Sequence, residues 1–312
     1  MKDGTGAPAL SIVVPVYNEE GNVQPLHAEL TRVAEEIGGT YEIIFVNDGS
    51  RDRTLARLEA LRTRDPHLRI VDLAGNFGEA AALSAGFAHA RGDVVVTLDG
   101  DGQNDPADIP LLLARLRPDV DVVSGRRRER KETFWTRVLP SRIANALIVR
   151  ATGVPVHDCG CGLKAYRREI VDGAQLPRGM NRFLPAILGV KASRVAEITV
   201  NDRRRGSGQS HYGLSRTFVV LRDLLALPIL VRRPPRARML GRALGGAQAA
   251  LVAVMLAAVL GALGWPANRI PAMALAAVAV GVAAVGWAIG HNLDRWARAQ
   301  EDGVFRVRAV RG

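Results

Sequence analysis

The sequence predicts an α/β fold with a mostly parallel sheet, followed by a pair of membrane-spanning helices. Between residues 10 and 200, short apolar runs rich in β-branched residues alternate with amphipathic stretches, as in parallel sheets whose strands are joined by helices. Two long uncharged segments follow. The 312 residues suffice for one domain of roughly 200 residues and an appendage.

The expected strands and helices alternate along the first part of the chain. Apolar runs predict strands at 10–14, 42–46, 69–73, 94–98 and 120–123. Amphipathic stretches predict helices at 23–37, 54–64, 79–90 and 106–116. Helices in this order cover both faces of a parallel sheet. Ligands of such sheets bind beyond the carboxyl ends of the strands, so the residues that follow each strand form the candidate site.

Two segments near the C-terminal end, 243–265 and 270–290, contain no charged residue and are rich in Ala, Val, Leu and Gly. Each has about the 20 residues that cross a hydrocarbon core. The alternative is a buried hairpin of a globular domain, whose helices would show a polar stripe that these segments lack. Arginines precede the first segment and follow the second, while the turn has only Arg269. The positive-inside rule therefore predicts a transmembrane hairpin with both termini in the cytoplasm.

These segments divide the chain into four expected parts. They are an α/β domain (1–215), a basic segment in the membrane interface (216–242), the transmembrane hairpin (243–291) and a cytoplasmic tail (292–312). No apolar run precedes the first strand, so we expect no signal peptide and an integral plasma-membrane protein whose α/β domain is cytoplasmic. The two cysteines, Cys159 and Cys161, are too close together for an ordinary disulfide and too few for a structural zinc site, which favours a reducing compartment.

The formal net charge of +11 indicates an anionic partner, which is nucleic acid, an acidic membrane or a phosphorylated substrate. A cluster of arginines between residues 232 and 242 precedes the first apolar segment and lacks interleaved aromatic residues. We therefore expect membrane lipids, and no nucleic acid, to meet much of this charge.

The most informative string is Thr97-Leu98-Asp99-Gly100-Asp101-Gly102-Gln103, which places two carboxylates directly after an apolar strand. Such a pair can hold Mg²⁺ or Mn²⁺ and leave coordination positions open for diphosphate oxygens. Asp99 and Asp101 are the predicted metal ligands, with Gln103 as a neutral oxygen donor. An isolated Asp-x-Asp also occurs in turns with solvated carboxylates, so the neighbouring strand ends decide the interpretation.

Polar residues also follow the first three strands. The first ends in Pro15-Val16-Tyr17-Asn18-Glu19, the second in Val46-Asn47-Asp48-Gly49, and the string Gly75-Asn76-Phe77-Gly78 closes the third. The carboxyl ends of parallel strands meet at one edge of the sheet. Together with the carboxylate pair, these strand ends predict a pocket for a nucleoside diphosphate.

These strings together resemble glycosyltransferase family 2, and more closely its polyprenyl-phosphate branch of dolichol-phosphate mannosyltransferases, undecaprenyl-phosphate glucosyltransferases and 4-amino-arabinose transferases. The resemblance covers residues 10–213 and rests on six motifs in the family's order. It implies a GT-A type fold and a divalent metal. It implies nucleotide-sugar contacts from Pro15, Tyr17, Glu19, Val46, Asp48, Asp99, Gly100, Asp101, Arg205 and His211.

The resemblance also implies an acceptor site. Arg127 and Arg137 are expected to grip a lipid phosphate, with Arg126 and Arg142 as alternatives. The alternative is that the charged side chains between Arg126 and Lys131 face only water or lipid headgroups. Asp158 falls in the family's acceptor segment near the reacting centre and is expected to be catalytic, although a phosphate acceptor is already ionised and gains little from a base.

The string from Arg203 to Gly213 matches a family loop that closes over the diphosphate. There Arg205 is the expected substrate-binding and catalytic arginine, which offsets charge on the leaving group. His211 stands where the eukaryotic mannosyltransferases carry a lysine. Because histidine is only partly charged near pH 7, its contact with the leaving group is expected to be weaker or pH-dependent.

The expected reaction is transfer of a monosaccharide, with inversion, from a UDP- or GDP-linked donor to a polyprenyl phosphate, for which undecaprenyl phosphate is favoured. One alternative is a membrane-bound family member that acts on another lipid or glycan; the Gln-x-x-Arg-Trp string of processive synthases is missing. Another is an inactive membrane scaffold, against which Asp99, Asp101 and Arg205 argue. The sugar, the base of the donor, the prenol length, the pathway and the oligomeric state are left open by the sequence.

Overall fold

The computed structural model describes residues 8–128, 149–150, 153–154, 156–176, 179–203 and 304–312, together with scattered residues between 280 and 294. The chain forms two compact units, residues 1–213 with 303–312, and residues 214–302. Within the described ranges, no helix is both long enough and apolar enough to cross a membrane. The predicted interfacial segment 216–242, the first predicted span and most of the second lie outside those ranges.

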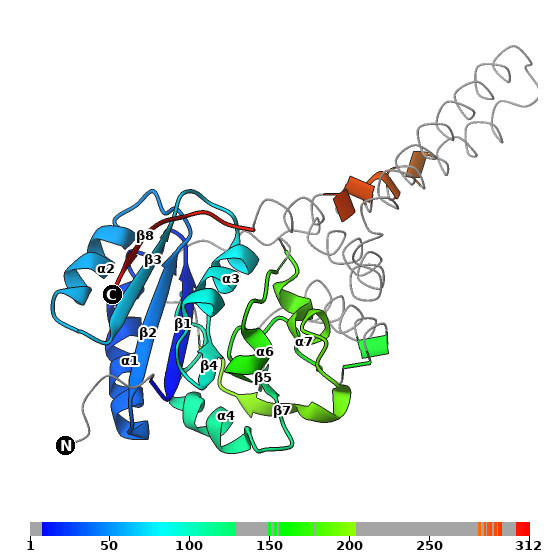
Figure 1. Ribbon diagram of the computed structural model, residues 1–312, viewed down its shortest axis with the longest axis horizontal. Coiled ribbons are helices and arrows are strands. Elements are labelled where there is room, and N and C mark those ends of the chain that lie inside the picture. The colour runs from blue at the N-terminus through cyan, green and yellow to red at the C-terminus, as the bar shows by residue number, and fades with distance from the viewer. Residues whose placement is uncertain are drawn as a thin grey trace, which may run out of the picture. The chain divides into compact units, whose positions relative to one another are not determined.

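An eight-stranded sheet forms the centre of the first unit, in the order β7-β5-β6-β4-β1-β2-β3-β8 (Figure 1). Strands β1 to β4 are parallel to one another, and β5 is parallel to β7. The short strand β6 is antiparallel to both of its neighbours, and β8 is antiparallel to β3. The bounds are β1 Leu10–Val16, β2 Tyr41–Asn47, β3 Leu68–Leu73, β4 Val94–Thr97, β5 Val122–Arg127, β6 Lys164–Arg167, β7 Val195–Val200 and β8 Val307–Arg311.

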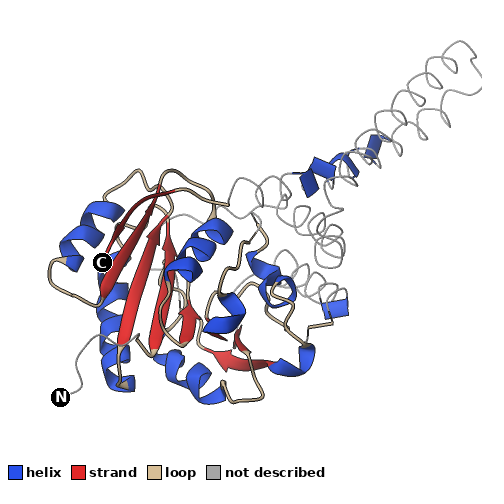
Figure 2. Cartoon of the chain, viewed as in Figure 1, coloured by secondary structure: helices blue, strands red, loops and turns tan. Residues whose placement is uncertain are grey.

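Helices cover both faces of this sheet (Figure 2), and each face has its own hydrophobic core. One core joins the sheet to α1 (Val23–Ile37), α2 (Thr54–Arg62) and α4 (Ile109–Arg115), which follows the 3-10 turn η1 (Pro106–Asp108). The other joins it to α3 (Glu79–His89), α6 (Arg168–Val171) and α7 (Leu184–Ile187). Two further 3-10 turns are η3 (Asn181–Phe183) and η4 (Ala192–Arg194). The α/β prediction with a mostly parallel sheet is confirmed.

The expected strands and helices up to residue 123 all form, with ends that shift by a few residues. Three strands were not expected. β6 and β7 are short or half-polar, and β8 lies in the segment that the sequence predicted to be a cytoplasmic tail. β8 has the sequence Val-Arg-Ala-Val-Arg and lies at the edge of the sheet, so it lacks the apolar run that marks a buried strand.

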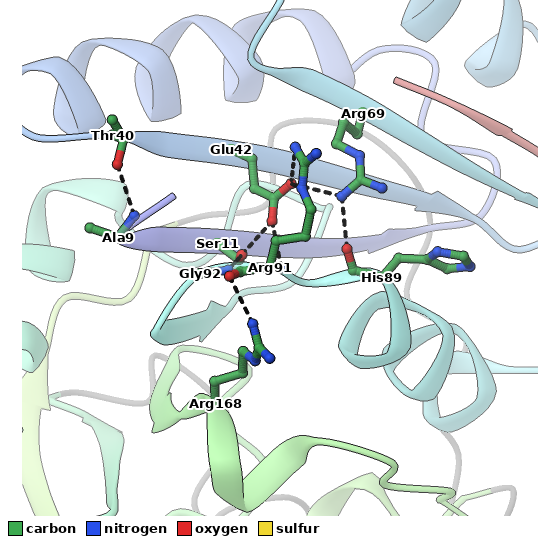
Figure 3. Close-up of polar contacts among 9 residues, drawn as sticks. All are labelled: Ala9, Ser11, Thr40, Glu42, Arg69, His89, Arg91, Gly92 and Arg168. Carbon is green, nitrogen blue, oxygen red and sulfur yellow. Dashed lines mark hydrogen bonds and ion pairs between the residues drawn. The ribbon is translucent and has the colours of Figure 1, made fainter. Parts of the chain in front are cut away.

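A polar cluster around Glu42 anchors the amino-terminal ends of the central strands (Figure 3). The Glu42 carboxylate is buried and accepts hydrogen bonds from Ser11 Oγ (2.7 Å), Arg69 Nη1 (2.7 Å) and the Arg91 backbone N–H (2.7 Å). Burial opposes ionisation, but these hydrogen bonds and the charge of Arg69 lower the pKa of Glu42. The cluster therefore links β1, β2, β3 and the segment before β4 at the edge opposite the predicted site.

Candidate active site

The loops that follow β1 and β2 are tied together by hydrogen bonds. The Asn18 N–H donates to Ser50 Oγ (3.0 Å), and the Arg51 N–H donates to Asn18 Oδ1 (2.8 Å). Asn18 adopts a left-handed conformation with φ 56°, which turns the chain sharply after β1. Tyr17, a predicted nucleotide contact, is 38% exposed at this turn. Its ring is therefore accessible to a planar base.

Asp48 connects the end of β2 to the loop after β3. Its Oδ1 accepts the Phe77 N–H (2.7 Å) and its Oδ2 accepts the Gly78 N–H (2.8 Å). The loops approach so closely that a Cβ on Gly49, at φ 66°, would lie 2.5 Å from the Gly75 carbonyl carbon. Asp48 thus shapes the expected nucleotide pocket by holding a backbone loop.

The other predicted nucleotide residues divide into two kinds. Pro15 lies one residue before the end of β1, with its carbonyl oxygen beside Gly100. Glu19 lies in the loop after β1 and accepts a hydrogen bond from Asn22 Nδ2 (2.5 Å). The Val46 side chain is fully buried in the core beneath α3. Only the backbone of Val46 can therefore face a ligand.

The carboxylate string forms a tight turn directly after β4. The Asp99 N–H donates to Asn104 Oδ1 (2.9 Å), and the Gln103 N–H donates to Asp101 Oδ1 (3.0 Å). A Cβ on Gly100 would lie 2.6 Å from Val16 Cγ1, so only glycine allows this turn to pack against β1. Asp99 and Asp101 come together at the carboxyl end of β4, as predicted.

Charge crowding at this turn is unfavourable without a cation. Burial, the charge of Glu79 and the charge of Asp101 raise the pKa of Asp99 to about 7, while Lys164 and Arg127 act in the opposite sense. Among the described residues, no group of three or more His, Cys, Asp or Glu side chains is arranged to hold a metal ion. Mg²⁺ sites commonly use one or two carboxylates with substrate phosphates, and the two hard oxygen ligands here fit that pattern.

The segment between Asp158 and Lys164 runs alongside the carboxylates. Thr97 Oγ1 donates to the Gly162 carbonyl (2.9 Å), and a Cβ on Gly162 would lie 2.5 Å from Asp99 Oδ2. Lys164, at the start of β6, is buried and its Nζ donates to the Cys161 carbonyl oxygen. Gly162 and Lys164 therefore form the wall beside Asp99.

The half-buried Arg127 forms an ion pair with the buried Asp158 at the end of β5. Arg127 Nε donates to Asp158 Oδ2 (2.8 Å) and Nη2 donates to Oδ1 (3.1 Å). Burial opposes the charge of the guanidinium, but Asp158 raises the pKa of Arg127 further above its ordinary value. Both Asp158 oxygens thus serve to orient the arginine. Arg126 is exposed, with Nη1 3.8 Å from Glu197 Oε2.

The chain after β7 returns to the carboxylate turn. The Arg203 N–H donates to the Gln103 carbonyl oxygen (2.9 Å), and the Arg203 guanidinium pairs with Glu29 (2.5 Å) and Asp105 (2.7 Å). This anchor lies two residues before Arg205. The predicted residues Arg137, Arg142, Arg205 and His211 are outside the described residues.

Sequence reasoning missed three residues that shape the site, namely Asn104, Gly162 and Lys164. Asn104 follows Gln103 by one residue, and an amide just after a carboxylate turn is a usable signal for a side chain that closes the turn. The other two are recognisable only once β6 is known to lie beside β4, with Lys164 opposite Thr97.

Comparison with known proteins identifies the family of this chain. The family model described as Glycosyl transferase family 2 matches residues 11–173. Dodecaprenyl-phosphate galacturonate synthase of Rhizobium johnstonii is 43% identical over 231 residues, covering 73% of this chain and 68% of that protein. Undecaprenyl-phosphate 4-deoxy-4-formamido-L-arabinose transferase of Pseudomonas aeruginosa (strain PAO1) is 39% identical over 263 residues, covering 83% and 76%.

The fold also matches a crystal structure of glucosyl-3-phosphoglycerate synthase from Mycobacterium tuberculosis in complex with Mn²⁺ and UDP-glucose. The TM-score is 0.54 at 20% identity, over 71% of this chain and 78% of that one. At this identity the match supports the fold alone. The family match and the two relatives confirm the resemblance found in the sequence, and the chain belongs to glycosyltransferase family 2.

Proposed function

We propose that the protein transfers a monosaccharide from a UDP- or GDP-sugar to a polyprenyl phosphate at the cytoplasmic face of the membrane. One observation carries the proposal. The segment from Asp158 to Lys164 contacts the carboxylate turn through Gly162. Through Asp158 it also contacts Arg127, the residue expected to bind the acceptor phosphate. A donor diphosphate at the carboxylates and an anionic acceptor at Arg127 would therefore meet at this segment. Both curated relatives are named for polyprenyl-phosphate products or acceptors.

The donor half of the site, formed by the residues that follow β1, β2, β3 and β4, suits a nucleoside diphosphate. Tyr17 offers a ring for the base, and Asp48 holds the backbone of residues 77 and 78 in place. Asp99 and Asp101 would hold Mg²⁺ or Mn²⁺, with Gln103 beside them. When bound, the cation supplies positive charge that stabilises the departing diphosphate.

The acceptor half of the site, formed around Arg127 and Asp158, suits a phosphate monoester. The ion pair with Asp158 uses Nε and Nη2 of Arg127 and leaves Nη1 outside the pair. An arginine held in this way offers its outer donors to phosphate oxygens without losing side-chain freedom on binding. Asp158 therefore acts as the residue that orients Arg127. Arg137 and Arg142 are proposed to add phosphate contacts, with Arg126 as an exposed alternative.

The proposed reaction is a single inverting displacement. An acceptor phosphate oxygen forms a bond to the anomeric carbon while the bond from that carbon to the β-phosphate oxygen breaks, and the nucleoside diphosphate leaves. The acceptor is already an anion, so no side chain has to remove a proton. Arg205, whose loop is anchored by Arg203 beside Gln103, would offset the charge on the leaving group, with His211 as a weaker and pH-dependent contact.

The membrane part of the proposal rests on the apolar segments 243–265 and 270–290 and on the arginines that flank them. A two-span hairpin would keep the α/β domain at the surface where a polyprenyl phosphate presents its headgroup. Undecaprenyl phosphate is the proposed acceptor because one curated relative is named for it.

The test is transfer of radiolabel from a panel of UDP- and GDP-sugars to undecaprenyl and dodecaprenyl phosphate, with detergent-purified protein and Mn²⁺ or Mg²⁺. We expect a chloroform-soluble product that is labile to mild acid. Asp101→Asn should lower the rate by at least about 100-fold, whereas Asp119→Asn, which changes an exposed carboxylate away from the turn, should not. No transfer from any donor would reject the proposal.

A further inference from the structure

The C-terminal strand β8 extends the sheet next to the donor half of the site. It pairs with β3 so that Val71 lies opposite Val310 and Asp72 opposite Ala309. In Figure 1, β8 lies along β3 at the edge of the sheet. The pairing continues past the end of β3, where the Ala74 N–H donates to the Arg306 carbonyl oxygen (2.8 Å). Ala74 directly precedes the string Gly75-Asn76-Phe77-Gly78, called here the donor loop.

The Arg308 side chain contacts both the strand and the start of the donor loop. Its Nη1 donates to Asp72 Oδ2 (3.3 Å), and its Nη2 donates to the Ala74 carbonyl oxygen (3.2 Å). Ala74 is therefore bonded through its N–H to Arg306, the residue before β8, and through its carbonyl group to Arg308 of β8. Asp72 is fully buried, so Arg308 also brings a cation to a carboxylate that water does not reach.

This contact continues through a hydrogen bond to Asn47, which directly precedes the residue that holds the donor loop. The other Asp72 oxygen, Oδ1, accepts a hydrogen bond from Asn47 Nδ2 (2.8 Å), and Asn47 Oδ1 accepts the Ser50 N–H (3.2 Å). The next residue, Asp48, binds the backbone of Phe77 and Gly78. The donor loop is thus bonded at its start by β8 and at its end by Asp48.

We infer that Arg308 is a positioning residue for nucleotide-sugar binding, and that β8 makes the segment after the predicted membrane hairpin a part of the donor site. The inference rests on the proposed function for the identity of the ligand. Arg308 does not touch the donor; it sets the position of the donor loop, which Asp48 then presents at the end of β2. Loss of Arg308 leaves the Asp72 carboxylate buried without its cation and releases the Ala74 carbonyl group.

The experiment measures the Kd of UDP and of GDP, each with Mn²⁺, for the full-length protein in detergent, by calorimetry. Arg308→Ala should weaken binding of the nucleotide that the wild type prefers about three- to tenfold, and Arg308→Lys should restore part of it. Steady-state assays should show the same rise in the donor KM, with the acceptor KM unchanged.

The matched control is Arg311→Ala. Arg311 lies on the same strand but pairs with Glu59 of α2, so its loss should leave nucleotide binding within about twofold. Equal weakening in both alanine variants would mean that any loosening of β8 has this effect and would overturn the specific role of Arg308.

Two further outcomes separate this inference from the proposed function. If the wild type binds UDP or GDP and Arg308→Ala binds it equally well, only the inference fails. If the wild type binds neither nucleotide, both fail. If thermal denaturation shows that Arg308→Ala does not fold, the test is made with Arg308→Lys instead. Unchanged nucleotide binding and an unchanged donor KM in Arg308→Lys would reject the role of the guanidinium.

Discussion

Replacing Gly162 by alanine should disable the site by moving a carboxylate that is 63 positions earlier in the chain. A Cβ at Gly162 would overlap the Asp99 carboxylate, lying nearest to Oδ1 and 2.5 Å from Oδ2, whereas ordinary contacts begin at 3.4 Å. The Asp99 carboxylate must therefore move by about 1 Å, a displacement that typically costs about 100-fold in rate. The polypeptide should still fold, because the strain falls on a side chain and not on backbone.

Gly160→Ala is the matched control for this substitution. Gly160 lies in the same segment, but its Cβ would lie 3.6 Å from Arg127 Nη2 and 3.7 Å from Asp158 Oδ1, which are ordinary contacts. Its activity should stay within about threefold of the wild type.

The assays for both variants are the rate of lipid-linked product formation and the Mn²⁺ affinity measured by electron paramagnetic resonance, with thermal denaturation as the check on folding. Gly162→Ala should lose both rate and Mn²⁺ affinity. Full activity in Gly162→Ala, or equal losses in the two variants, would refute the reasoning that Asp99 needs the space beside this glycine.

Three other predictions follow from the charged pairs of the structure. Burial and neighbouring carboxylates raise the pKa of Asp99 to about 7, so protons compete with metal below that pH. The apparent Mn²⁺ affinity should therefore fall as the pH drops from about 8 to about 6. An affinity that is constant over this range would contradict the prediction. Glu42→Gln should lower the free energy of unfolding by about 3 kcal/mol, because Arg69 is left without its buried partner, as measured by denaturant titration. The pKa of Glu42 is lower in the folded state than its unfolded value near 4.5. Its stabilising contribution is therefore present above the unfolded pKa and is lost as pH falls through the folded pKa. The difference in free energy of unfolding between wild type and variant should accordingly shrink in acid. Asp158→Asn should raise the acceptor KM about tenfold or more, because Arg127 loses its fixed orientation, and an equal rise in the donor KM would argue against this assignment.

The strand ends of the donor half could be predicted because they depend on local pattern. Buried parallel strands need continuous apolar runs, and the polar residues that end those runs lie at one edge of the sheet whatever the order of the strands. Asp99, Asp101 and Asp48 were found by this reasoning. The roles of individual side chains were less accessible: the Val46 side chain turned out to be in the core, and Asp48 binds backbone N–H groups.

The acceptor half shows the opposite case. Arg127 and Asp158 were both expected in the site, one as a phosphate ligand and the other near the reacting centre. Their pairing was not expected, since they are 31 positions apart and no local periodicity relates them. The structure brings them together because β5 and the segment before β6 lie side by side in the sheet.

The sequence by itself determined the α/β class, the alternation of strands and helices in the first half of the chain, the carboxylate motif after β4 and the family to which the chain belongs. Each of these depends on residues close together in the chain, where hydrophobic periodicity and turn chemistry act directly. Only the tertiary structure decided that Gly162 lies against Asp99, that Asp158 orients Arg127, and that β8 returns to bind the start of the donor loop through Arg308. These contacts depend on the order of the strands, in which β6 is an antiparallel strand in the middle of the sheet and β8 one at its edge. The pairing of one strand with another that is distant in the chain leaves no periodic signal in either segment.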